Sequence, residues 1–196
     1  MIFASRNARK VTELEQILGV PLEPLPDEVE MPPEDEDTFA GNALIKARAA
    51  RAATGEAVIS DDSGIEVDAL DGRPGVRSAR YAGENASDGE NLAKVLKELG
   101  ASGGGPGARY VCVIAYIDKA GEEHLFAGTC GGRLTQETRG DGGFGYDPAF
   151  IPDETRASDE RTMAELGPLE KHAISHRGKA VRAFAEYLDG NSATRA

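Results

Sequence analysis

The sequence contains no tryptophan and only two cysteines, Cys112 and Cys130, among its 196 residues. Two cysteines form neither a disulfide framework nor a four-thiolate zinc site, so we expect reduced thiols and a cytoplasmic location. The sequence also lacks any run of about 18 apolar residues, which excludes a helix that spans a membrane. Its first ten residues, MIFASRNARK, lack the long apolar stretch of a secretory signal.

Positive charge is scarce as well. The chain has 22 Lys and Arg against 34 Asp and Glu, which gives a net charge of −12. This balance argues against a nucleic acid polymer as a partner, because such binding needs a basic surface. It does not exclude a nucleotide, since a few local cations can hold a triphosphate. Hydrophobic residues make up 40% and charged residues 29%, which is typical of a globular chain with one domain, or one domain with two lobes.

Short apolar runs alternate with segments of helical periodicity, and this alternation favours an α/β architecture. The pattern predicts strands at residues 1–5, 57–60, 65–69, 110–117 and 125–135, and helices at 11–18, 38–53, 88–99 and 175–190. We expect Thr38 and Asp88 to be N-caps, and Gly19 and Gly190 to end helices. The predicted irregular segments are a proline-rich, solvated loop at 20–37, a hinge at 102–107 and a frayed tail at 191–196.

The segment Ser5–Lys10 lies between the first predicted strand and helix. A helix N-terminus presents unpaired N–H groups and the positive end of the helix dipole, which suits a phosphate. Ser5 and Asn7 add hydrogen-bonding groups, and Lys10 adds a charge. A capped helix with surface cations is the alternative interpretation.

Asp61 and Asp62 follow an apolar strand and precede Ser63 and Gly64. Adjacent carboxylates repel each other unless a cation or hydrogen-bond donors compensate, and carboxylate oxygens suit Mg²⁺. Neighbouring side chains of an extended segment point to opposite sides, so we expect the two acids to differ in role. An acidic turn is the alternative interpretation.

Two further stretches lie in the second half of the chain. Residues 140–148 combine glycines, which let a backbone approach a ligand, with Phe144 and Tyr146, which can stack on a base. Donors cluster at Lys171, His176 and Arg177, where they can meet a base edge or a phosphate. The alternatives are a glycine-rich hairpin packed by its aromatic residues and an ordinary helix cap. Taken together, the four stretches indicate a nucleoside triphosphate site with the means of hydrolysis.

The sequence resembles the inosine/xanthosine triphosphate pyrophosphatases, the Ham1-like family. The resemblance runs from Ile2 to about Leu188 and rests on seven ordered blocks. The first four blocks are SRNARK at 5–10, TFAGNALIKA at 38–47, ISDDSGIEVDAL at 59–70 and PGVRSARYAG at 74–83. The last three are GGFGYDPAF at 142–150, TMAEL at 162–166 and EKHAISHRGKA at 170–180.

The resemblance implies a single domain over residues 1–190. Its fold would be an elongated, two-lobed α/β protein with a long curved mixed sheet, helices packed around it and an active-site cleft between the lobes. It further implies a homodimer that needs Mg²⁺ and does not bind a membrane. The implied reaction is hydrolysis of ITP, dITP and XTP, the products of purine deamination, between the α and β phosphates. The products are the monophosphate and pyrophosphate, and the role is cleansing of the nucleotide pool.

The resemblance also implies roles for individual residues. Asp62 matches the catalytic carboxylate, both as general base and as a magnesium ligand, and a polarised water would reconcile these two roles. Donors from His176 or Arg177 would pair with the 6-carbonyl group of the base and would be left unpaired against adenine. The implied substrate-binding residues are Ser5, Arg6, Asn7, Ala8, Arg9, Lys10, Lys46, Ser63, Phe144, Gly145, Tyr146, Asp147, Lys171, His176 and Arg177.

The sequence departs from the family pattern at two places. Gly41 stands where many relatives carry Glu, so we expect the second metal carboxylate to be Glu34, which precedes Thr38 and Phe39 at the distance that relatives show. Gly167-Pro168 interrupts a usually more polar stretch, and we expect it to alter a helix and not the chemistry. Two rival hypotheses are a nucleotide sensor without turnover and a hydrolase of the same fold with other triphosphate substrates.

Overall fold

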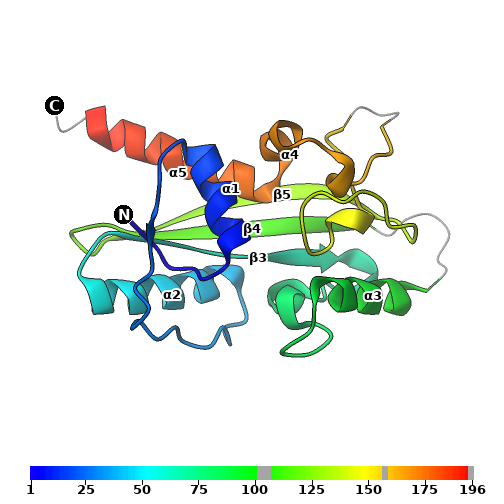
Figure 1. Cartoon of the computed structure of the whole chain (residues 1–196), viewed down its shortest axis with the longest axis horizontal. Coiled ribbons are helices and arrows are strands. Elements are labelled where there is room, and N and C mark those ends of the chain that lie inside the picture. Colours follow the sequence, from blue (N-terminus) through cyan, green and yellow to red (C-terminus); the bar gives the residue numbers. More distant parts are fainter. Residues whose placement is uncertain (101–106, 156–158, 194–196) are drawn as a thin grey trace. The chain divides into compact units, whose positions relative to one another are not determined.

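The computed structural model describes residues 1–100, 107–155 and 159–193, so most of the predicted hinge at 102–107 lies outside the described residues (Figure 1). The strands are β1 (Ile2–Phe3), β2 (Glu23–Pro24), β3 (Val58–Val67), β4 (Gly107–Ile117), β5 (Glu123–Leu134) and β6 (Phe150–Pro152). The α-helices are α1 (Ala8–Leu18), α2 (Phe39–Thr54), α3 (Asp88–Leu99), α4 (Pro168–Ile174) and α5 (His176–Ala193). Short 3₁₀ segments occupy Asp68–Leu70, Gly75–Arg80, Asp147–Ala149 and Met163–Glu165.

The strands form one six-stranded sheet in the order β2-β1-β3-β4-β5-β6. β1 pairs in parallel with both β2 and β3, whereas β5 and β6 pair antiparallel, so the sheet is mixed. β4 lies between β3 and β5, and its neighbouring residues Ile114 and Ala115 are both fully buried. The predicted α/β architecture with a mixed sheet, and the central place of the strand at 110–117, are confirmed.

Capping residues set the ends of the first two long helices, and Gly19 and Thr38 have the roles predicted for them. Asn7 caps α1, whose last turn closes on Gly19 in the left-handed conformation (φ 69°). Thr38 caps α2, since its hydroxyl accepts a hydrogen bond from Gly41 N at 3.0 Å. Such caps satisfy N–H groups that a helix leaves without an internal partner.

Three helix boundaries differ from the predicted ones. Helix α1 begins at Ala8 and not at residue 11, because Asn7 caps it there. Ser87, and not Asp88, caps α3, because Ser87 and Glu90 form a reciprocal capping box. Helix α5 continues to Ala193, so Gly190 does not end it. A glycine inside a helix costs about 1 kcal/mol relative to alanine, which the packing of the rest of the helix can offset. Residues 194–196 of the predicted tail lie outside the described part of the chain.

β3 differs more from the prediction. Two separate strands were predicted, at 57–60 and 65–69, with an acidic turn at Asp61 and Asp62 as the alternative interpretation. The structure instead has one continuous strand of ten residues that includes both aspartates. The Gly167-Pro168 pair begins a helix, as the cap and the first residue of α4. Proline suits that first position because the N–H group it lacks would have no partner within the helix.

The chain divides into two compact units, which we describe separately. Unit 1 comprises Met1–Asp62, Cys112–Gly128 and the chain from Arg177 onward, and unit 2 comprises Ser63–Val111 and Thr129–His176. None of the helices in the described ranges has the length and apolar character that a membrane span requires.

Unit 1 has a core on each face of its strands because successive side chains alternate. Ile2, Val58 and Ala115 pack against the alanines of α2, whereas Phe3, Ile59 and Ile114 pack against α1 and α5. Figure 1 shows α2 on one side of β3 and β4 and the pair α1 and α5 on the other. These two layers fix the position of the part of β3 that carries Asp61 and Asp62.

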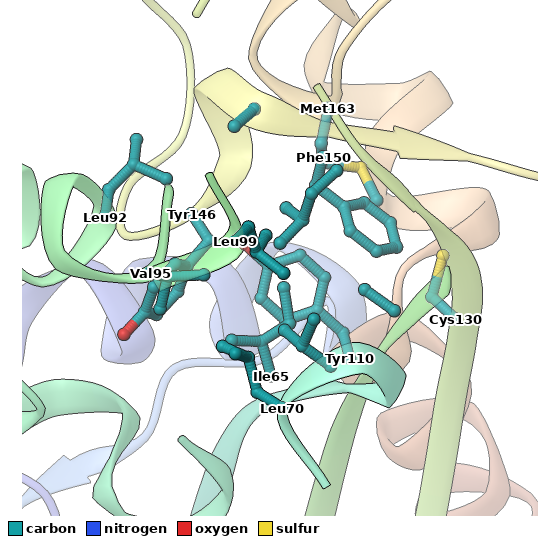
Figure 2. Packing of buried hydrophobic residues seen from close by; sticks show 14 of the residues in the cluster. Ile65, Leu70, Leu92, Val95, Leu99, Tyr110, Cys130, Tyr146, Phe150 and Met163 are labelled. Atoms are coloured by element: carbon teal, nitrogen blue, oxygen red, sulfur yellow. The ribbon is translucent and has the colours of Figure 1, made fainter. Parts of the chain in front are cut away.

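Unit 2 has one core, which Figure 2 shows from close by. Leu92, Val95 and Leu99 of α3 pack against residues of β3, β4 and β6. Tyr110 lies in this cluster, with its ring edge-on to Phe150 at a centroid distance of 4.7 Å. Each fully buried side chain of this size contributes about 1.5–3 kcal/mol, so the cluster gives the neighbouring polar residues a rigid support.

Candidate active site

β3 presents two adjacent buried carboxylates in unit 1. Asp61 is 1% exposed and Asp62 is 5% exposed. Asp61 contacts Lys10 and Arg177, whereas Asp62 contacts Asn42 and Lys46. The two carboxylates therefore have different sets of partners, as the alternation of side chains along a strand predicts.

Asp61 is surrounded by cations. Lys10 Nζ lies 3.1 Å from Oδ1 and 3.0 Å from Oδ2, and Arg177 Nη2 lies 3.5 Å from Oδ2. Burial would raise the pKa of Asp61, but the charges of Lys10, Arg177 and Lys46 hold it well below its usual range. Arg177 also pairs with Glu13. Asp61 therefore stays ionised and holds a group of cations in place.

Asp62 has the opposite electrostatic character. Burial raises the pKa of Asp62 to about 6, the charge of Lys46 opposes this change, and the charge of Glu34 adds to it. Asn42 Nδ2 donates to Oδ2 at 3.1 Å, and Lys46 Nζ lies 4.0 Å from Oδ1. A carboxylate whose pKa lies near neutral pH is suited to accept a proton from a reactant.

Glu34, the predicted second metal ligand, reaches the same lysine as Asp62. Its carboxylate pairs with Lys46 Nζ, which also donates to the backbone oxygen of Asp61 at 2.6 Å. Asn42 holds the segment that follows Glu34, since its side chain accepts from Glu36 N at 3.1 Å and donates to Glu36 O at 3.4 Å. One amide group therefore links the acidic segment to Asp62.

Gly41 makes room for this arrangement. A Cβ atom at position 41 would lie 2.8 Å from Glu36 Cβ and 3.1 Å from Glu36 Oε2. The side chain of Glu36 therefore occupies the space that any larger residue at position 41 would need. Because the missing Cβ lets Glu36 lie against the first turn of α2, it helps to bring Glu34 toward Lys46.

The oxygen donors of Asp62 and Glu34 fit a hard divalent cation. Both carboxylates contact the Lys46 ammonium group, so a positive charge already lies between them. Burial raises the pKa of Asp62 more than the charge of Lys46 lowers it, so a further positive charge beside this carboxylate would be stabilising. Mg²⁺ binds through one or two carboxylates together with substrate phosphates, which matches this pair.

A separate group of possible ligands lies at the turn between β4 and β5. Ligand atoms of Asp118, Glu122 and His124 lie within 4.8 Å of one another. Asp118 Oδ1 accepts from Glu122 N at 2.9 Å, an ordinary contact of an aspartate in a turn, and Tyr187 OH lies 3.0 Å from His124 Nε2. These contacts explain the positions of Asp118 and His124, and we assign the group no role in the chemistry of Asp62.

The segment Ser5–Lys10 shapes the start of α1 in unit 1. Asn7 Oδ1 accepts from the backbone N–H groups of Arg9 and Lys10, and Ser5 Oγ accepts from Asn7 N. Arg6 donates to the backbone oxygens of Asp27 and Val29, so it anchors the loop that follows β2. Ala8 and Arg9 are exposed. Within this segment Lys10 alone has a side-chain contact to Asp61 among the contacts the structure describes.

Asp147 organises the predicted base-binding residues in unit 2, and it is 3% exposed. Its Oδ2 atom accepts from Lys171 Nζ and from Phe144 N, each at 2.9 Å, and its Oδ1 atom accepts from Tyr110 OH at 3.0 Å. A Cβ at Gly143 would lie 2.0 Å from Asp147 Oδ2, and Gly143 also has a φ of 72°. The loop can close on the carboxylate only because glycine occupies this position.

The two aromatic residues of this loop have different surroundings. Phe144 is half-buried, and Lys171 Nζ lies 5.2 Å from its ring centroid. Tyr146 belongs to the core of unit 2, and its hydroxyl donates to Ser78 O at 2.8 Å. Phe144 is therefore the ring that can stack on a base, while Tyr146 fixes the loop to the core. Gly145, between them, has a φ of 65°.

The remaining predicted residues lie in different units. His176, 6% exposed, stacks on Tyr110 in unit 2 at a centroid distance of 4.5 Å and an interplanar angle of 7°. Lys171, in the same unit, is 8% exposed. Arg177 belongs to unit 1, where it contacts Asp61 and Glu13, and this placement connects it with the cations around Asp61. Ser63 follows Asp62 in β3 and is half-buried.

Sequence reasoning missed three residues of this arrangement: Asn42, Glu13 and Tyr110. Asn42 lies on α2 four residues before Lys46, and this spacing places both side chains on one helix face. Since Lys46 was predicted to bind substrate, the spacing could have indicated that Asn42 lies in the same site. Glu13 and Tyr110 contact groups 164 and 37 residues away, and no local pattern indicates such pairs.

The chain is similar to known proteins over nearly its whole length. A model of the Ham1 family matches residues 1–187. The dITP/XTP pyrophosphatase of Geobacter sulfurreducens is 46% identical over 199 residues, with 96% of each chain covered. That of Rhodospirillum centenum is 45% identical over 188 residues, which cover 93% of this chain and 91% of the relative. The solved HAM1 protein of Coxiella burnetii is 39% identical, with a TM-score of 0.86 over 96% of this chain and 98% of its own.

Proposed function

Because the chain belongs to the Ham1 family, we propose that it hydrolyses dITP, XTP and ITP to the nucleoside monophosphate and pyrophosphate. The observation that carries this proposal is the buried Asp62 carboxylate, whose pKa is raised to about 6 beside Lys46. Water is added across the anhydride bond between the α and β phosphates. This reaction removes deaminated purines from the nucleotide pool.

The residues of unit 1 act on the triphosphate. Lys10 and Lys46 already bind carboxylate oxygens, and their positive charge suits phosphate oxygens equally well. Asp62 accepts the proton that the attacking water loses, and Asn42 keeps one carboxylate oxygen fixed while this occurs. Asp61 keeps Lys10 and Arg177 in place, because the charges around it lower its pKa and keep it ionised at neutral pH.

Asp62 and Glu34 would hold Mg²⁺. When bound, the ion supplies positive charge that offsets the negative charge of the phosphate oxygens as the anhydride bond breaks. Asn42 anchors the acidic segment that carries Glu34, so the same amide orients both carboxylates. The Lys46 ammonium group holds the two carboxylates close together until substrate arrives.

The residues of unit 2 bind the base. Phe144 stacks on the purine ring, and Lys171 and His176 donate to the carbonyl group that hypoxanthine and xanthine carry at position 6. Adenine carries an amino group there, which would leave a buried donor without an acceptor at a cost of about 1–3 kcal/mol. The preference over adenine therefore follows from donors that Asp147 and Tyr110 hold in place. Guanine shares the 6-carbonyl group, so its rejection depends on its 2-amino group.

The proposal extends to assembly and location. We propose a cytoplasmic homodimer, as the family resemblance implies, that takes a small nucleotide and no nucleic acid polymer. The low exposure of both cysteines fits a reducing compartment, in which buried thiols remain free. Size-exclusion chromatography with light scattering measures the subunit number directly.

A hydrolysis panel tests the proposed reaction. Purified protein is given ITP, dITP, XTP, GTP, ATP and dUTP, with Mg²⁺ or with EDTA, and pyrophosphate and orthophosphate are measured separately. We expect magnesium-dependent pyrophosphate from the first three substrates and far less from the others. Orthophosphate as the product would contradict the proposed bond, and binding of ITP without any product would favour a nucleotide sensor.

A further inference from the structure

Tyr110 is a buried tyrosine in β4 that the proposed reaction does not use directly. Its side chain contacts two of the proposed base-binding residues at once. The hydroxyl donates to Asp147 Oδ1 at 3.0 Å, and the ring stacks on His176 with the planes 7° apart. The third contact, edge-on to Phe150, attaches the ring to the core of unit 2.

The hydroxyl of Tyr110 has one O–H donor that needs an acceptor in a dry environment, and Asp147 Oδ1 is that acceptor. Tyr110 is 6% exposed and Asp147 is 3% exposed, so water cannot readily replace either partner. Burial, together with the adjacent charge of Asp147, raises the pKa of Tyr110 well above its usual value. The phenol therefore remains protonated and donates to the carboxylate at every pH at which the protein works.

This donation leaves the second oxygen of Asp147 for the residues that touch the base. Asp147 Oδ2 accepts from Lys171 Nζ and from Phe144 N, and both atoms belong to residues proposed to bind the purine. Without the Tyr110 hydroxyl, Asp147 Oδ1 would lose its donor and the carboxylate group could rotate. Either oxygen could then accept from Lys171 Nζ, so the position of this ammonium group would no longer be fixed. The orientation of Lys171 in α4 and of Phe144 in its loop thus depends on a hydroxyl from strand β4.

We propose that Tyr110 is a positioning residue for base recognition, which fixes Asp147 through its hydroxyl and His176 through its ring. This inference rests on the proposed function, since it concerns the residues assigned to the purine. It assigns Tyr110 no contact with the triphosphate. The effect of losing its hydroxyl should therefore be confined to the base.

The test compares the wild-type protein with Tyr110→Phe, which keeps both ring contacts and removes only the hydroxyl. We expect KM for XTP to rise about tenfold, or ~1.4 kcal/mol, with kcat little changed. Tripolyphosphate has no base, so its inhibition constant against XTP hydrolysis should stay the same. Tyr187→Phe is the matched control, because it removes a hydroxyl that faces His124 in unit 1 and should leave KM for XTP unchanged.

A double-mutant cycle tests the route through Asp147. If Tyr110 acts through this carboxylate, Tyr110→Phe should add little to the rise in KM that Asp147→Asn causes alone. Additive effects of the two substitutions would overturn this route. An equal rise in KM for XTP and in the inhibition constant of tripolyphosphate would also overturn the inference, as would a Tyr110→Phe protein that does not fold.

A binding measurement separates this inference from the proposed function. Titration calorimetry with XTP in EDTA gives its dissociation constant without turnover. A wild-type protein that binds XTP but does not hydrolyse it would contradict the proposed reaction, yet a tenfold weaker binding by Tyr110→Phe would still support the role of Tyr110. Hydrolysis by the wild-type protein with unchanged XTP binding in the variant would overturn the role of Tyr110 alone.

Discussion

Asp61 and Asp62 are adjacent in β3, yet the pKa of Asp61 is lowered and the pKa of Asp62 is raised from the usual value of an aspartate. The cations Lys10, Arg177 and Lys46 keep Asp61 ionised, whereas burial and the charge of Glu34 raise the pKa of Asp62 to about 6. The contrast arises because alternate side chains of a strand meet different partners. Asp61 therefore serves as a permanent charge that holds cations in place, whereas Asp62 can accept and release a proton.

Asp62→Asn should abolish turnover without unfolding the protein. The amide keeps the size of the side chain but cannot accept a proton, so we expect kcat to fall by at least about 100-fold, the usual contribution of a general base. Activity is measured as pyrophosphate released from XTP, and folding by thermal melting in EDTA. Full activity of this variant would contradict the role of Asp62, and a lowered melting temperature would make the loss of activity uninformative.

Asp61→Asn should instead destabilise the fold. It removes the carboxylate that half-buried Lys10 contacts and one of the two carboxylates that buried Arg177 contacts. The cost should therefore stay below that of a fully unpaired buried charge, which is about 3–5 kcal/mol. Because folding lowers the pKa of Asp61, its contribution is complete above its unfolded pKa of about 3.9 and is lost as the pH falls below that value. Urea unfolding should therefore show a gap from wild type that narrows between pH 7 and pH 3. Asp189→Asn, at an exposed position, is the control.

Phe144→Ala should weaken nucleotide binding through the base alone. Stacking of a base on an aromatic ring is worth about 1–3 kcal/mol, so KM for XTP should rise by roughly 5- to 150-fold. The inhibition constant of tripolyphosphate should not change. Leu169→Ala removes an apolar side chain that is 85% exposed and serves as the control in the same unit. A parallel loss of affinity for tripolyphosphate would contradict the assignment of Phe144 to the base.

Gly41→Ala should reduce activity, and Glu36→Gly should restore it. The added Cβ would collide with Glu36 Cβ at 2.8 Å, and the resulting shift should move the acidic segment and Glu34 away from Lys46. The magnesium concentration for half-maximal activity should then rise in the single variant and return toward wild type in the double variant. Gly190→Ala in α5 meets no atom within 4 Å, so it should only stabilise the helix, by about 1 kcal/mol.

Cys112 should not react with thiol reagents in the folded protein. It is fully buried between β-strand and helix, and burial raises the pKa of its thiol to about 12. The thiolate is therefore scarce at pH 8, and raising the pH to 9 should increase labelling very little. Mass spectrometry after short exposure to the reagent, with and without urea, measures this. Rapid labelling without urea would contradict the prediction.

The parts of the molecule that the sequence predicted are those that local patterns determine. The apolar run around Ile114 indicated a central strand, and Thr38 and Gly19 have side-chain or backbone preferences that act within a few residues. The adjacency of Asp61 and Asp62 likewise indicated two different roles. In each case the relevant interaction lies within the same element or its flanking residues.

The parts that the sequence did not predict depend on partners far along the chain. The acidic stretch at 61–64 has the composition of a turn, and it is a strand only because Lys10, Asn42 and Arg177 compensate its charge. Tyr146 was predicted to stack on a base together with Phe144, yet it lies in the core, where its hydroxyl donates to Ser78 O. Tyr110 had the pattern of any apolar strand residue, and its hydroxyl acquires a purpose only through Asp147.

The ten-residue strand β3 should tolerate few insertions or deletions of single residues. Shifting this strand by a single residue in one direction would put Asp61 in the place of Asp62 and Ser60 in the place of Asp61. In the other direction, Ser63 would take the place of Asp62. Either shift leaves one of the two carboxylate positions with a serine. The same shift would turn Val58 away from α2 and Ile59 away from α1 and α5, so both faces of the strand would lose their packing. A frame-preserving indel within 58–67 should therefore remove activity and stability together, whereas one in the exposed turn around Gly55 and Glu56 should be tolerated.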